Sequence, residues 1–336
     1  MESLNNISIL EQLQNTRIMP PYDIPPHQFL FTWNDIPCFA KGELVAITGK
    51  AKSGKTYLNS ILMAVATGKP IVHLKRIDDK PYRVLWIDTE QSEDSTCEIL
   101  RDRIGTLIGA IPNEELYHIY NLRSFDYKTR EQLAFAAILY TKPDLVIFDG
   151  IRDIVADINN YDEAQNIIGK LLSIASHSNA CIVCVLHQNK AADDKSMRGA
   201  IGSELLNKSY ECYSTTKNEA TIFSVKQIAT RKYDINNPIQ FTITPDGIPI
   251  ECAVVEEEEN IDVQEVFESV LQNTEMRAMT MKNIIRAKHK ITESEYGALI
   301  GEALRLGIIS KRVVSDREVY YKLKDNNEPT DTKLGA

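Results

Sequence analysis

Short apolar segments alternate with amphipathic stretches from residue 41 to about residue 250. Several of these segments are apolar at nearly every position, which is typical of strands that are covered on both faces. The predicted strands are Leu44–Thr48, Val84–Asp88, His118–Leu122, Leu145–Asp149, Cys181–Leu186, Thr221–Gln227 and Ile239–Thr244. The stretches between the first five strands have the spacing of helices and include Thr56–Thr67, Thr129–Thr141 and Asp162–Ser176.

This repeated order of strand and helix predicts an α/β domain over residues 41–250, built on a mostly parallel sheet. Ligands of such sheets bind at the carboxyl ends of the strands, so chemistry is expected there. The last two strands follow each other without an intervening helix. We therefore expect an antiparallel edge at this end of the sheet.

The residues before and after this domain follow other patterns. Residues 1–40 begin with an amphipathic pattern and continue through the proline-rich stretch Pro20–Pro26, which can be neither helix nor inner strand. They are predicted to form an extended N-terminal arm, either a flexible leader or a segment that packs on a neighbouring subunit. Residues 251–260 include four consecutive glutamates and are predicted to be an acidic, solvated linker.

Residues 261–324 show three amphipathic segments followed by two short strands. The predicted helices are Val263–Leu271, Met281–His289 and Ser294–Leu306, and the predicted hairpin pairs Ile308–Val314 with Glu318–Leu323. Three helices followed by a hairpin is the layout of a winged helix, a variant of the helix-turn-helix. Residues 325–336 are polar and are expected to form a disordered tail.

The composition limits the class of protein. With 336 residues, 43% hydrophobic and 25% charged, the chain is typical of globular proteins and long enough for two domains. Its net charge of −9 argues against a protein coated in nucleic acid but leaves a local basic groove open. The sequence shows neither a signal peptide nor an apolar run near the ~18 residues that a membrane helix needs. We therefore expect a cytoplasmic protein that has no membrane partner.

Six cysteines do not indicate a disulfide framework in a chain of this length. One CxxC pattern, Cys181 and Cys184, lies within an apolar run, and residues three apart on a strand point to opposite faces. These two thiols are therefore poor candidates for a shared zinc ion. Buried strand cysteines in a reducing compartment are the better interpretation.

The strongest motif is GxxxxGK[ST], which directly follows the strand Leu44–Thr48 and opens a helical stretch. Its glycines let backbone N–H groups face phosphates at the helix N-terminus. Lys55 can reach the β- and γ-phosphates, and the Thr56 hydroxyl can take one Mg²⁺ position. The motif therefore predicts a site for ATP and Mg²⁺. The candidate nucleotide-binding residues are Gly49, Lys50, Ala51, Lys52, Ser53, Gly54, Lys55, Thr56 and Tyr57.

Two acidic residues at strand ends could complete a hydrolytic site. Asp149 follows four apolar residues and is the candidate carboxylate for Mg²⁺, although it could instead cap the next loop. Glu90 follows the strand Val84–Asp88 at the same sheet edge and is the candidate that orients or deprotonates the attacking water. Glu90 could instead start the next helix, near whose positive end a carboxylate is favourable.

The order of these motifs resembles that of RecA-fold P-loop ATPases. In that family the phosphate-binding loop is followed by strands that end as Ile87–Glu90, Asp149 and His187-Gln188 do here. Within it, residues 40–250 look most similar to the RepA-type hexameric helicases of plasmids and other mobile elements, an AAA-type branch close to the KaiC and RadA ATPases. The resemblance implies that Glu90 activates water and that Gln188 senses the γ-phosphate.

The resemblance also implies a nucleic-acid-binding loop from Asn189 to about Lys208. In the family this loop lines the pore of a homo-oligomeric ring, expected here to be hexameric, and contacts single-stranded DNA. Its candidate DNA-binding residues are Lys190, Lys195 and Arg198. A mobile surface loop without a ligand is the alternative. His187 has the simpler interpretation of a strand-end histidine that is hydrogen-bonded within the sheet, and it is a poor candidate for a metal ligand because no second histidine or cysteine lies at a useful spacing.

Family members complete each nucleotide site with a cation from the neighbouring subunit, placed after a late strand. Arg231 is the candidate in this chain, and Lys226 and Lys232 are alternates. Such a cation typically contributes about 10³–10⁵ in rate, so it would make hydrolysis depend on assembly. An ordinary exposed cation is the other interpretation. The predicted catalytic set is Lys55, Glu90, Asp149, Gln188 and Arg231.

The third predicted helix of the winged-helix-like segment, Ser294–Leu306, carries two glutamates and one arginine, which is unfavourable for phosphate contact. Basic residues lie instead on the second helix and the hairpin. Contact with DNA through the hairpin and docking of replication or mobilisation proteins both stay open for this segment.

The sequence therefore predicts a RecA-like α/β ATPase with a C-terminal winged-helix-like domain. Its predicted function is an ATP-hydrolysing, ring-forming motor on single-stranded DNA, in replication or mobilisation of a mobile element. The alternative is a nucleotide-switched DNA-binding, recombination-mediator or scaffold ATPase without unwinding activity. A small-molecule kinase is disfavoured because Arg152 is the only arginine between Asp149 and Cys181, where such an enzyme needs an arginine-rich lid.

Overall fold

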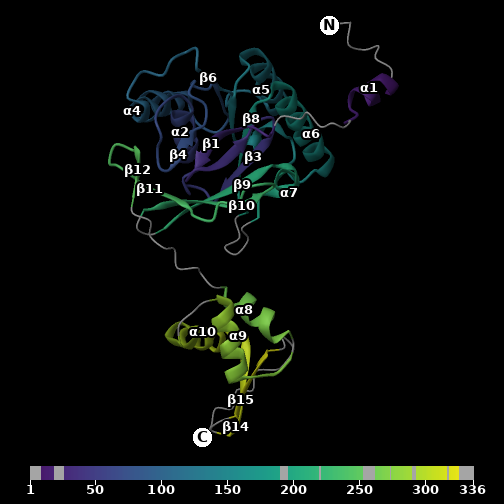
Figure 1. Cartoon of the computed structure of the whole chain (residues 1–336), viewed down its shortest axis with the longest axis vertical. Helices are drawn as coiled ribbons and strands as arrows, with labels where there is room; N and C mark the ends of the chain where they lie inside the picture. The colour runs from purple at the N-terminus through teal and green to yellow at the C-terminus, as the bar shows by residue number, and fades with distance from the viewer. Residues whose placement is uncertain are drawn as a thin grey trace. The chain divides into compact units, whose positions relative to one another are not determined.

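The computed structural model describes residues 9–18, 26–189, 196–218, 221–252, 262–272, 274–289, 293–315 and 318–324. The chain divides into two compact units, Met1–Val255 and Glu256–Ala336, each with a hydrophobic core of its own (Figure 1). Among the described residues, no helix combines the length and the apolar character needed to cross a membrane.

A nine-stranded sheet forms the centre of the first unit, in the order β12-β11-β10-β9-β3-β8-β7-β5-β6. The strands from β9 to β6 in this order run parallel. The remaining three form the antiparallel edge that the sequence predicts. The bounds are β3 (Leu44–Gly49), β5 (Val84–Asp88), β6 (Tyr117–Asn121), β7 (Leu145–Asp149), β8 (Cys181–His187), β9 (Glu211–Lys217), β10 (Phe223–Thr230), β11 (Ile239–Ile243) and β12 (Pro249–Glu251).

Helices cover both faces of this sheet (Figure 1). One face packs on α2, and the other packs on α5, α6 and α7. Successive side chains of β3 alternate between the two layers, so Val45 and Ile47 join the first core and Leu44 and Ala46 join the second. This burial on both faces explains the uninterrupted apolar run. The bounds are α2 (Lys55–Thr67), α5 (Tyr127–Thr141), α6 (Tyr161–Ser178) and α7 (Gly199–Lys208).

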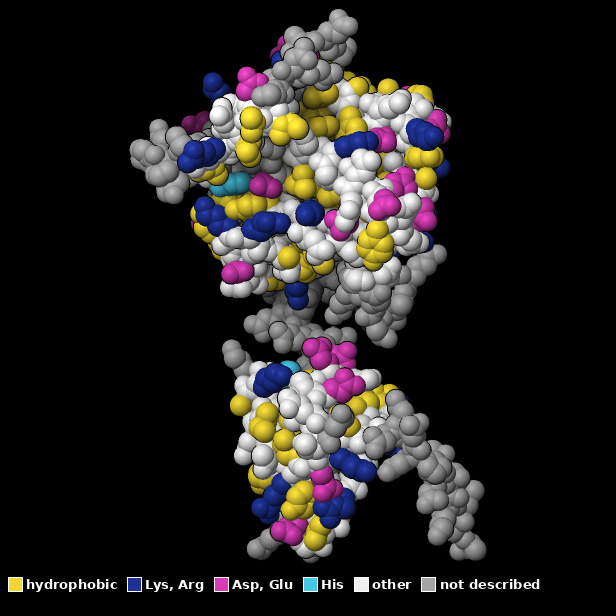
Figure 2. All heavy atoms as spheres, turned by 90° about the vertical axis from the view of Figure 1, so that its right-hand side faces the viewer, with side chains coloured by type: hydrophobic (Ala, Val, Ile, Leu, Met, Phe, Trp, Pro, Cys, Tyr) yellow, Lys and Arg dark blue, Asp and Glu magenta, His cyan; other side chains and the backbone are white. Residues whose placement is uncertain are grey.

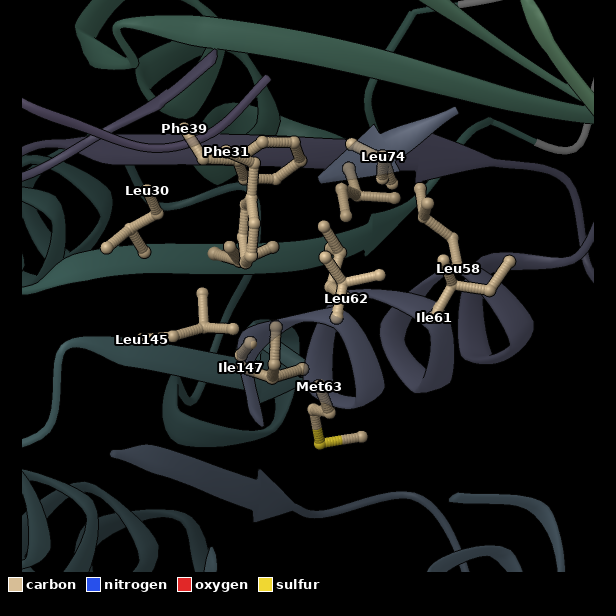
Figure 3. Packing of buried hydrophobic residues seen from close by; sticks show 14 of the residues in the cluster. Leu30, Phe31, Phe39, Leu58, Ile61, Leu62, Met63, Leu74, Leu145 and Ile147 are labelled. Carbon is tan, nitrogen blue, oxygen red and sulfur yellow. The ribbon is translucent and has the colours of Figure 1, made fainter. Parts of the chain in front are cut away.

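The core beneath α2 fixes the helix that follows the phosphate-binding loop. Figure 3 shows Leu58 and Leu62 of this helix directed toward Leu74 and Phe31. All four side chains are essentially inaccessible to solvent. Burying a side chain of this size stabilises a fold by about 1.5–3 kcal/mol. The position of α2, and with it the position of Lys55, therefore rests on tightly packed residues.

Residues 29–40 correct the prediction of an N-terminal arm that extends to residue 40. β1 (Phe29–Trp33) and β2 (Ile36–Ala40) form an antiparallel hairpin, and β4 (Leu74–Arg76) pairs with β1. The apolar side chains of this small sheet pack into the core on the α2 side, which outweighs the influence of the upstream prolines. Of the arm, residues 1–8 and 19–25 lie outside the described residues, and α1 (Ile9–Asn15) is helical.

Residues 199–217 correct the prediction of a long loop from Asn189 to Lys208. They form α7 and β9, and β9 pairs in parallel with β3. Ile201 and Leu205 of α7 are fully buried in the core that includes α6. Their spacing of four residues is a helical signal that the loop interpretation passed over. The predicted loop therefore ends before Gly199, and its residues Lys190 and Lys195 lie outside the described residues.

The packing of α7 can be tested by stability. Ile201→Ala should lower the free energy of unfolding by about 2–5 kcal/mol, because it removes buried methyl groups and leaves a cavity. Leu206→Ala on the same helix is the control, because Leu206 is 40% exposed. Urea denaturation of both variants measures the difference. Equal, small losses for the two variants would contradict a packed α7.

Short helical elements connect β5 to β6 and β7 to α6. They are α3 (Glu93–Glu98), the π-helical segment η1 (Ile99–Ile104), α4 (Gly105–Ile108) and the 3-10 turn η2 (Ile151–Ile154). Ser92 caps α3 by accepting a hydrogen bond from the N–H of Ser95, and two acidic residues occupy the first turn of the helix. The cap and the charges explain why a helix starts at Glu93, three residues after Glu90.

In its described residues, the second unit contains three helices and an antiparallel sheet in the order β13-β15-β14. Its core includes Phe267, Leu271, Ile285 and Ala303, which are fully buried. The predicted helices and hairpin are confirmed, whereas β13 is only two residues long and leaves no pattern in the sequence. The bounds are α8 (Val263–Leu271), β13 (Met276–Arg277), α9 (Ala278–His289), α10 (Glu293–Arg305), β14 (Ile309–Ser315) and β15 (Glu318–Leu323).

The predicted linker and tail fall mainly outside the described residues. Residues 253–261 and 325–336 belong to those stretches. Glu251, the first residue of the predicted linker, is the last residue of β12 and pairs with Phe241 of β11. The domain therefore extends at least to residue 251, one residue beyond its predicted end, and β12 is a further strand that the sequence pattern did not predict.

Candidate active site

The phosphate-binding loop leaves the carboxyl end of β3 and enters α2. Two glycines bound it, Gly49 with a φ of 156° and Gly54 with a φ of 101°. A Cβ on Gly49 would lie 2.4 Å from the hydroxyl of Ser53, and one on Gly54 would lie 2.5 Å from the ring of Phe223. Side chains at these two positions would collide with their neighbours, so the path of the loop requires both glycines of the motif.

The loop holds the ammonium group of Lys55 in its centre. The Nζ of Lys55 donates hydrogen bonds to the carbonyl oxygens of Gly49 at 3.0 Å and Lys50 at 2.8 Å. Burial lowers the pKa of Lys55 to about 8, although Glu90 and Asp149 act in the opposite direction. Lys55 therefore keeps its positive charge at neutral pH. The strand–loop–helix geometry places this charge where the motif predicts a phosphate.

Asp149 ends β7 and is 3% exposed. The amide Nδ2 of Asn59, on α2, donates a hydrogen bond to its Oδ2 at 3.2 Å. Burial raises the pKa of Asp149 to about 7, and the charges of Glu90 and Asp88 act in the same direction. A positive charge near this carboxyl group would favour its ionised form.

Asp88 ends β5, directly beside Asp149 in the sheet register. Its Oδ1 accepts hydrogen bonds from the backbone N–H groups of Glu90 and Gln91, both at 3.1 Å. Its Oδ2 accepts a hydrogen bond from the hydroxyl of Thr96 at 2.6 Å. Asp88 is completely buried, so it fixes the backbone of Glu90 while the side chain of Glu90 stays 40% exposed.

Thr89 joins the ends of β5 and β7. Its hydroxyl lies within hydrogen-bonding distance of the carbonyl oxygens of Asp149 at 2.9 Å and Gly150 at 3.1 Å, and of Asp153 Oδ2 at 3.0 Å. The backbone N–H of Thr89 also donates to the carbonyl of Asp149. These contacts hold the two strand ends that carry Glu90 and Asp149 at a fixed spacing.

His187 ends β8 and contacts Glu90. Its Nε2 lies 3.4 Å from Glu90 Oε1. This hydrogen bond lowers the pKa of Glu90, and the charges of Lys55 and Arg152 lower it further, against the effect of burial. Glu90 is therefore a carboxylate at neutral pH. It can accept a proton or a hydrogen bond from a water molecule beside the phosphate-binding loop.

The segment after β8 is tied directly to the phosphate-binding loop. The backbone N–H of Gln188 donates to the carbonyl of Gly49 at 3.2 Å, and Gln188 forms a β-bridge with Met197. The N–H of Arg198 returns to the carbonyl of His187 at 3.1 Å. These segments enclose a cavity of about 410 Å³, lined by Lys50, Ala51, His187, Gln188, Asn189 and Arg198.

Arg231 is not brought to the site of its own chain. It follows β10, whose last residue pairs with Glu211. Glu211 lies beside Val45 at the amino end of β3, whereas the phosphate-binding loop leaves the carboxyl end. Its guanidinium donates hydrogen bonds to the carbonyl oxygens of Ser209 at 3.3 Å and Asn207 at 3.1 Å, at the end of α7. Of the alternates, Lys226 lies on β10 opposite Ser214 of β9, and Lys232 lies over the rings of Phe29 and Tyr233.

Tyr57 lies one residue beyond the phosphate-binding loop. Its ring packs against Arg103, whose guanidinium carbon is 4.1 Å from the ring centre, and against Phe223, whose ring centre is 5.4 Å away. Arg103 in turn donates to the carbonyl of Gly247 at 3.2 Å. The structure therefore gives Tyr57 a packing role next to the loop.

A family model described as an AAA domain, AAA_25, matches residues 31–193. This part of the chain is a P-loop ATPase domain. The structure of a KaiC-like protein from the hyperthermophilic archaeon Pyrococcus horikoshii OT3 aligns with this chain at 13% sequence identity and a TM-score of 0.46, covering 65% of this chain and 92% of that chain. No curated protein sequence matches the chain.

The residues of the P-loop ATPase domain fit a nucleotide with its magnesium ion. The tight path at Gly49 and Gly54 leaves backbone rather than side chains around the Lys55 ammonium group. Thr56 and Asp149 offer a hydroxyl and a carboxylate, which are the hard oxygen ligands that Mg²⁺ prefers. The bond from Asn59 to Asp149 brings the first turns of α2 beside the end of β7. Bound there, Mg²⁺ would offset the negative charge of the phosphates.

The raised pKa of Asp149 gives the P-loop ATPase domain a pH dependence. Because a metal ligand must be deprotonated, Mg²⁺-dependent nucleotide binding should weaken as pH falls below about 7, approaching tenfold per pH unit. Titrations with Mg²⁺ and a fluorescent ATP analogue from pH 6 to pH 8 measure this. In Asp149→Asn, the part of the pH dependence that comes from Asp149 should disappear. The part that comes from protonation of the nucleotide's own phosphates should stay. An unchanged slope in Asp149→Asn would contradict the assignment.

Several residues that shape this site were not predicted from the sequence. Asn59 and its neighbour Ser60 are fully buried polar residues that interrupt the apolar run of α2, and that interruption could have identified Asn59. Thr89 and Thr96 gave no such signal, because their partners come from other elements. The two CxxC thiols lie in opposite cores, Cys181 on the α2 side and Cys184 on the α5 side, as predicted. Within the described residues, no group of three or more metal-ligating side chains is present.

Proposed function

We propose that this chain is an ATP-hydrolysing, ring-forming DNA motor that resembles RepA-type replicative helicases and acts on single-stranded DNA. Its P-loop ATPase domain supplies the hydrolytic chemistry. The host process we propose is replication or mobilisation of a mobile element. The partners are further copies of the chain, single-stranded DNA, and replication or mobilisation proteins.

The proposed reaction transfers the γ-phosphoryl group of ATP to water, giving ADP and phosphate. The loop N–H groups and Lys55 hold the phosphates. Thr56 and Asp149 would hold Mg²⁺, which offsets the charge of the phosphates. Glu90 orients the attacking water and accepts its proton, because it is an exposed carboxylate at the mouth of the site. Gln188 contacts the γ-phosphate and loses that contact on hydrolysis.

The observation that carries the motor proposal is the direct link between the phosphate-binding loop and the segment after β8. Gln188 bonds the carbonyl of Gly49, and the same segment returns through Met197 and Arg198 to β8. A change at the phosphate would shift Gly49, and the hydrogen bond from Gln188 to Gly49 would pass this shift to the residues after Gln188. Cations at Lys190, Lys195 and Arg198 would give this loop its affinity for the DNA backbone.

Assembly is proposed because the ATPases that this chain resembles complete each nucleotide site with a cation from the neighbouring subunit. Arg231 of a neighbouring subunit is the candidate, with Lys226 and Lys232 as alternates. Arg231 is exposed, but its guanidinium already bonds the end of α7, so donation to a neighbour would exchange those bonds for the phosphate.

The role of Arg231 can be separated from its bond to α7 by mixing subunits. Arg231→Ala should keep ATP binding and lose about 10³-fold or more in turnover. Adding Glu90→Gln subunits, whose Arg231 is intact, should restore part of the activity at shared interfaces. Steady-state ATPase assays over a range of mixing ratios measure the recovery. The absence of recovery at every ratio, together with a lower melting temperature, would identify Arg231 as a cap of α7.

The second unit supports a winged-helix assignment by its order of elements. The short strand β13 lies between α8 and α9 and pairs with β15, so the hairpin and the three helices form one body. Figure 2 shows Lys and Arg side chains mixed with acidic and hydrophobic ones at the end of this unit. Several cations are already paired, Lys282 and Arg286 with Glu293 and Arg312 with Glu275. This pairing favours docking of proteins over broad contact with DNA.

The experiment that tests the proposed function is ATP hydrolysis by the purified chain with and without single-stranded DNA, with oligomer mass measured in parallel. The motor predicts strong stimulation together with a ring-sized species. Arg198→Ala should reduce the stimulation, and Lys208→Ala, at the end of the packed helix α7, is the matched control. Unstimulated hydrolysis by a monomer or dimer would leave the ATPase and reject the motor.

The bonds of Arg231 to the end of α7 favour a second candidate function. A chain that keeps this cation for its own structure would be a nucleotide-switched DNA-binding or scaffold ATPase without unwinding activity. The ATPase assay with and without DNA distinguishes the two functions, because a switch would bind DNA without accelerated turnover.

A further inference from the structure

Asn59 is a polar residue in the buried part of α2, one turn after the phosphate-binding loop, and it is 0% exposed. Its amide Nδ2 donates a hydrogen bond to Asp149 Oδ2 at 3.2 Å. Its Oδ1 is buried and accepts no hydrogen bond from any part of the chain that the structure describes. A buried acceptor without a partner destabilises a fold, so an amide at this position requires an explanation.

The orientation of the Asn59 amide follows from the chemistry of Asp149. A carboxylate that is ready to bind a metal ion is ionised, so it accepts hydrogen bonds and donates none. The amide must therefore turn its Nδ2 toward Asp149, and its Oδ1 needs a donor of its own. One end of this amide is thus held by a candidate ligand of Mg²⁺, and the other end is open to a donor.

The neighbouring groups of α2 that could donate are bonded elsewhere. The ammonium group of Lys55, four residues before Asn59, donates to two carbonyl oxygens of the phosphate-binding loop. The hydroxyl of Ser60 donates to the carbonyl of Thr56 at 2.9 Å. The donor that Asn59 lacks is therefore expected from a molecule that binds at the site.

Asn59 is adjacent to both candidate ligands of Mg²⁺. It bonds Asp149 directly, and it follows Thr56 by three residues, a spacing that makes two side chains neighbours on a helix. The phosphates of a bound nucleotide are acceptors and cannot satisfy the Oδ1. Mg²⁺ usually keeps several of its water molecules, and each of these is a donor. A water molecule on Mg²⁺ therefore matches the missing partner.

We propose that Asn59 is a positioning residue of the magnesium site, whose Nδ2 orients Asp149 and whose Oδ1 accepts a hydrogen bond from a water molecule on Mg²⁺. Partners that hold the ligands of a metal typically contribute about 10–100-fold to its affinity. This inference rests on the Mg²⁺-dependent nucleotide site of the proposed function. It depends neither on DNA nor on assembly.

Two substitutions of Asn59 and one control separate this role from ordinary packing. Asn59→Ala leaves space in the core and Asn59→Leu fills it, so an effect that is common to both comes from the lost hydrogen bonds. Ser60→Ala is the matched control. Ser60 is also a fully buried polar residue of the same helical turn, but its hydroxyl has a partner within α2.

The measurement is binding of a fluorescent ATP analogue to the full-length chain, in EDTA and over a series of Mg²⁺ concentrations. In EDTA, all three variants should bind the analogue within about twofold of the unmodified chain. The Mg²⁺ concentration that gives half of the gain in affinity should rise about 10–100-fold in both Asn59 variants. It should change by less than about twofold in Ser60→Ala.

A double substitution tests whether Asn59 acts through Asp149. Asp149→Asn alone should lower the affinity for Mg²⁺. Adding Asn59→Ala should then reduce it by less than the product of the two separate losses, because both changes affect one ligand. Losses that multiply in full would show that the two residues act independently, and they would overturn the positioning role.

Two further results would overturn the inference and leave the ATPase site in place. The first is an unchanged Mg²⁺ dependence in both Asn59 variants. The second is an equal loss of analogue affinity with and without Mg²⁺, together with a lower melting temperature of the nucleotide-free chain, because Asn59 would then only join α2 to β7. Analogue binding that is independent of Mg²⁺ in the unmodified chain would overturn both this inference and the proposed reaction.

Discussion

Replacement of Lys55 by alanine should lower the rate of ATP hydrolysis by at least about 10²–10³-fold, the usual loss when one donor to transition-state charge is removed. The ammonium group is buried in the loop and bonded to the carbonyls of Gly49 and Lys50, so water would replace it poorly. Lys55→Ala should also weaken nucleotide binding. Steady-state phosphate release and binding of a fluorescent ATP analogue measure the two effects.

Lys69→Ala is the control for this substitution. Lys69 is an exposed lysine just after the same helix, so its removal changes the net charge by the same amount without touching the loop. Its rate should stay within about twofold of the unmodified chain, in keeping with the small effects of surface substitutions. Hydrolysis at the unmodified rate in Lys55→Ala would remove the phosphate-binding loop from the reaction.

The second large effect is expected for Glu90→Gln, with a loss of about 10²–10⁴-fold in turnover and little change in ATP affinity. The amide keeps the size and the hydrogen-bonding capacity of the side chain but cannot accept a proton from water. The Asp88 contacts to the backbone N–H groups of Glu90 and Gln91 should survive, because they do not involve the side chain of Glu90. Single-turnover hydrolysis separates the chemical step from binding.

Asp94→Asn is the matched control, since Asp94 is an exposed acid in the first turn of α3, four residues after Glu90. It should hydrolyse ATP at close to the unmodified rate. If Glu90→Gln retained full turnover, the water would have to be activated by another group, and Asp153, bonded to Thr89 in the same strand-end cluster, would be the next to test.

The parallel centre of the fold was predictable because its strands are buried on both faces. β7, for example, is buried at all five positions and reads as four apolar residues and an aspartate. β9 was missed because Glu211, Ser214 and Thr215 interrupt its apolar pattern. Glu211 is nevertheless 1% exposed, and its carboxylate accepts hydrogen bonds from the N–H of Phe39 at 2.6 Å and the hydroxyl of Tyr213 at 3.1 Å. The contact from Phe39 comes from a distant part of the chain, and a local pattern cannot show it.

The candidate site also contains some residues that the sequence predicts and some contacts that it does not. The positions of Lys55, Glu90 and Asp149 follow from a motif and from strand ends, since the carboxyl ends of parallel strands meet at one edge. The bonds of Asn59 to Asp149 and of Thr96 to Asp88 could not be derived, because they depend on which elements pack together. For Arg231, the sequence suggested a role but did not show the contacts of its side chain. Its position after a late strand suggested a role at a neighbour's site, whereas the partners of its guanidinium are visible only in three dimensions.

The two bonds from Lys55 to the loop carbonyls also bear on how the domain behaves between nucleotides. An ammonium group left without partners would either draw water into the loop or pull the loop out of shape. Here the carbonyls of Gly49 and Lys50 satisfy it, and the left-handed Gly54 keeps the start of α2 in place. Each incoming nucleotide then finds the loop already shaped and trades one set of oxygens around the ammonium group for another. Repeated cycles of loading and release would therefore require no refolding at the loop, and their speed would be set by the segments that move.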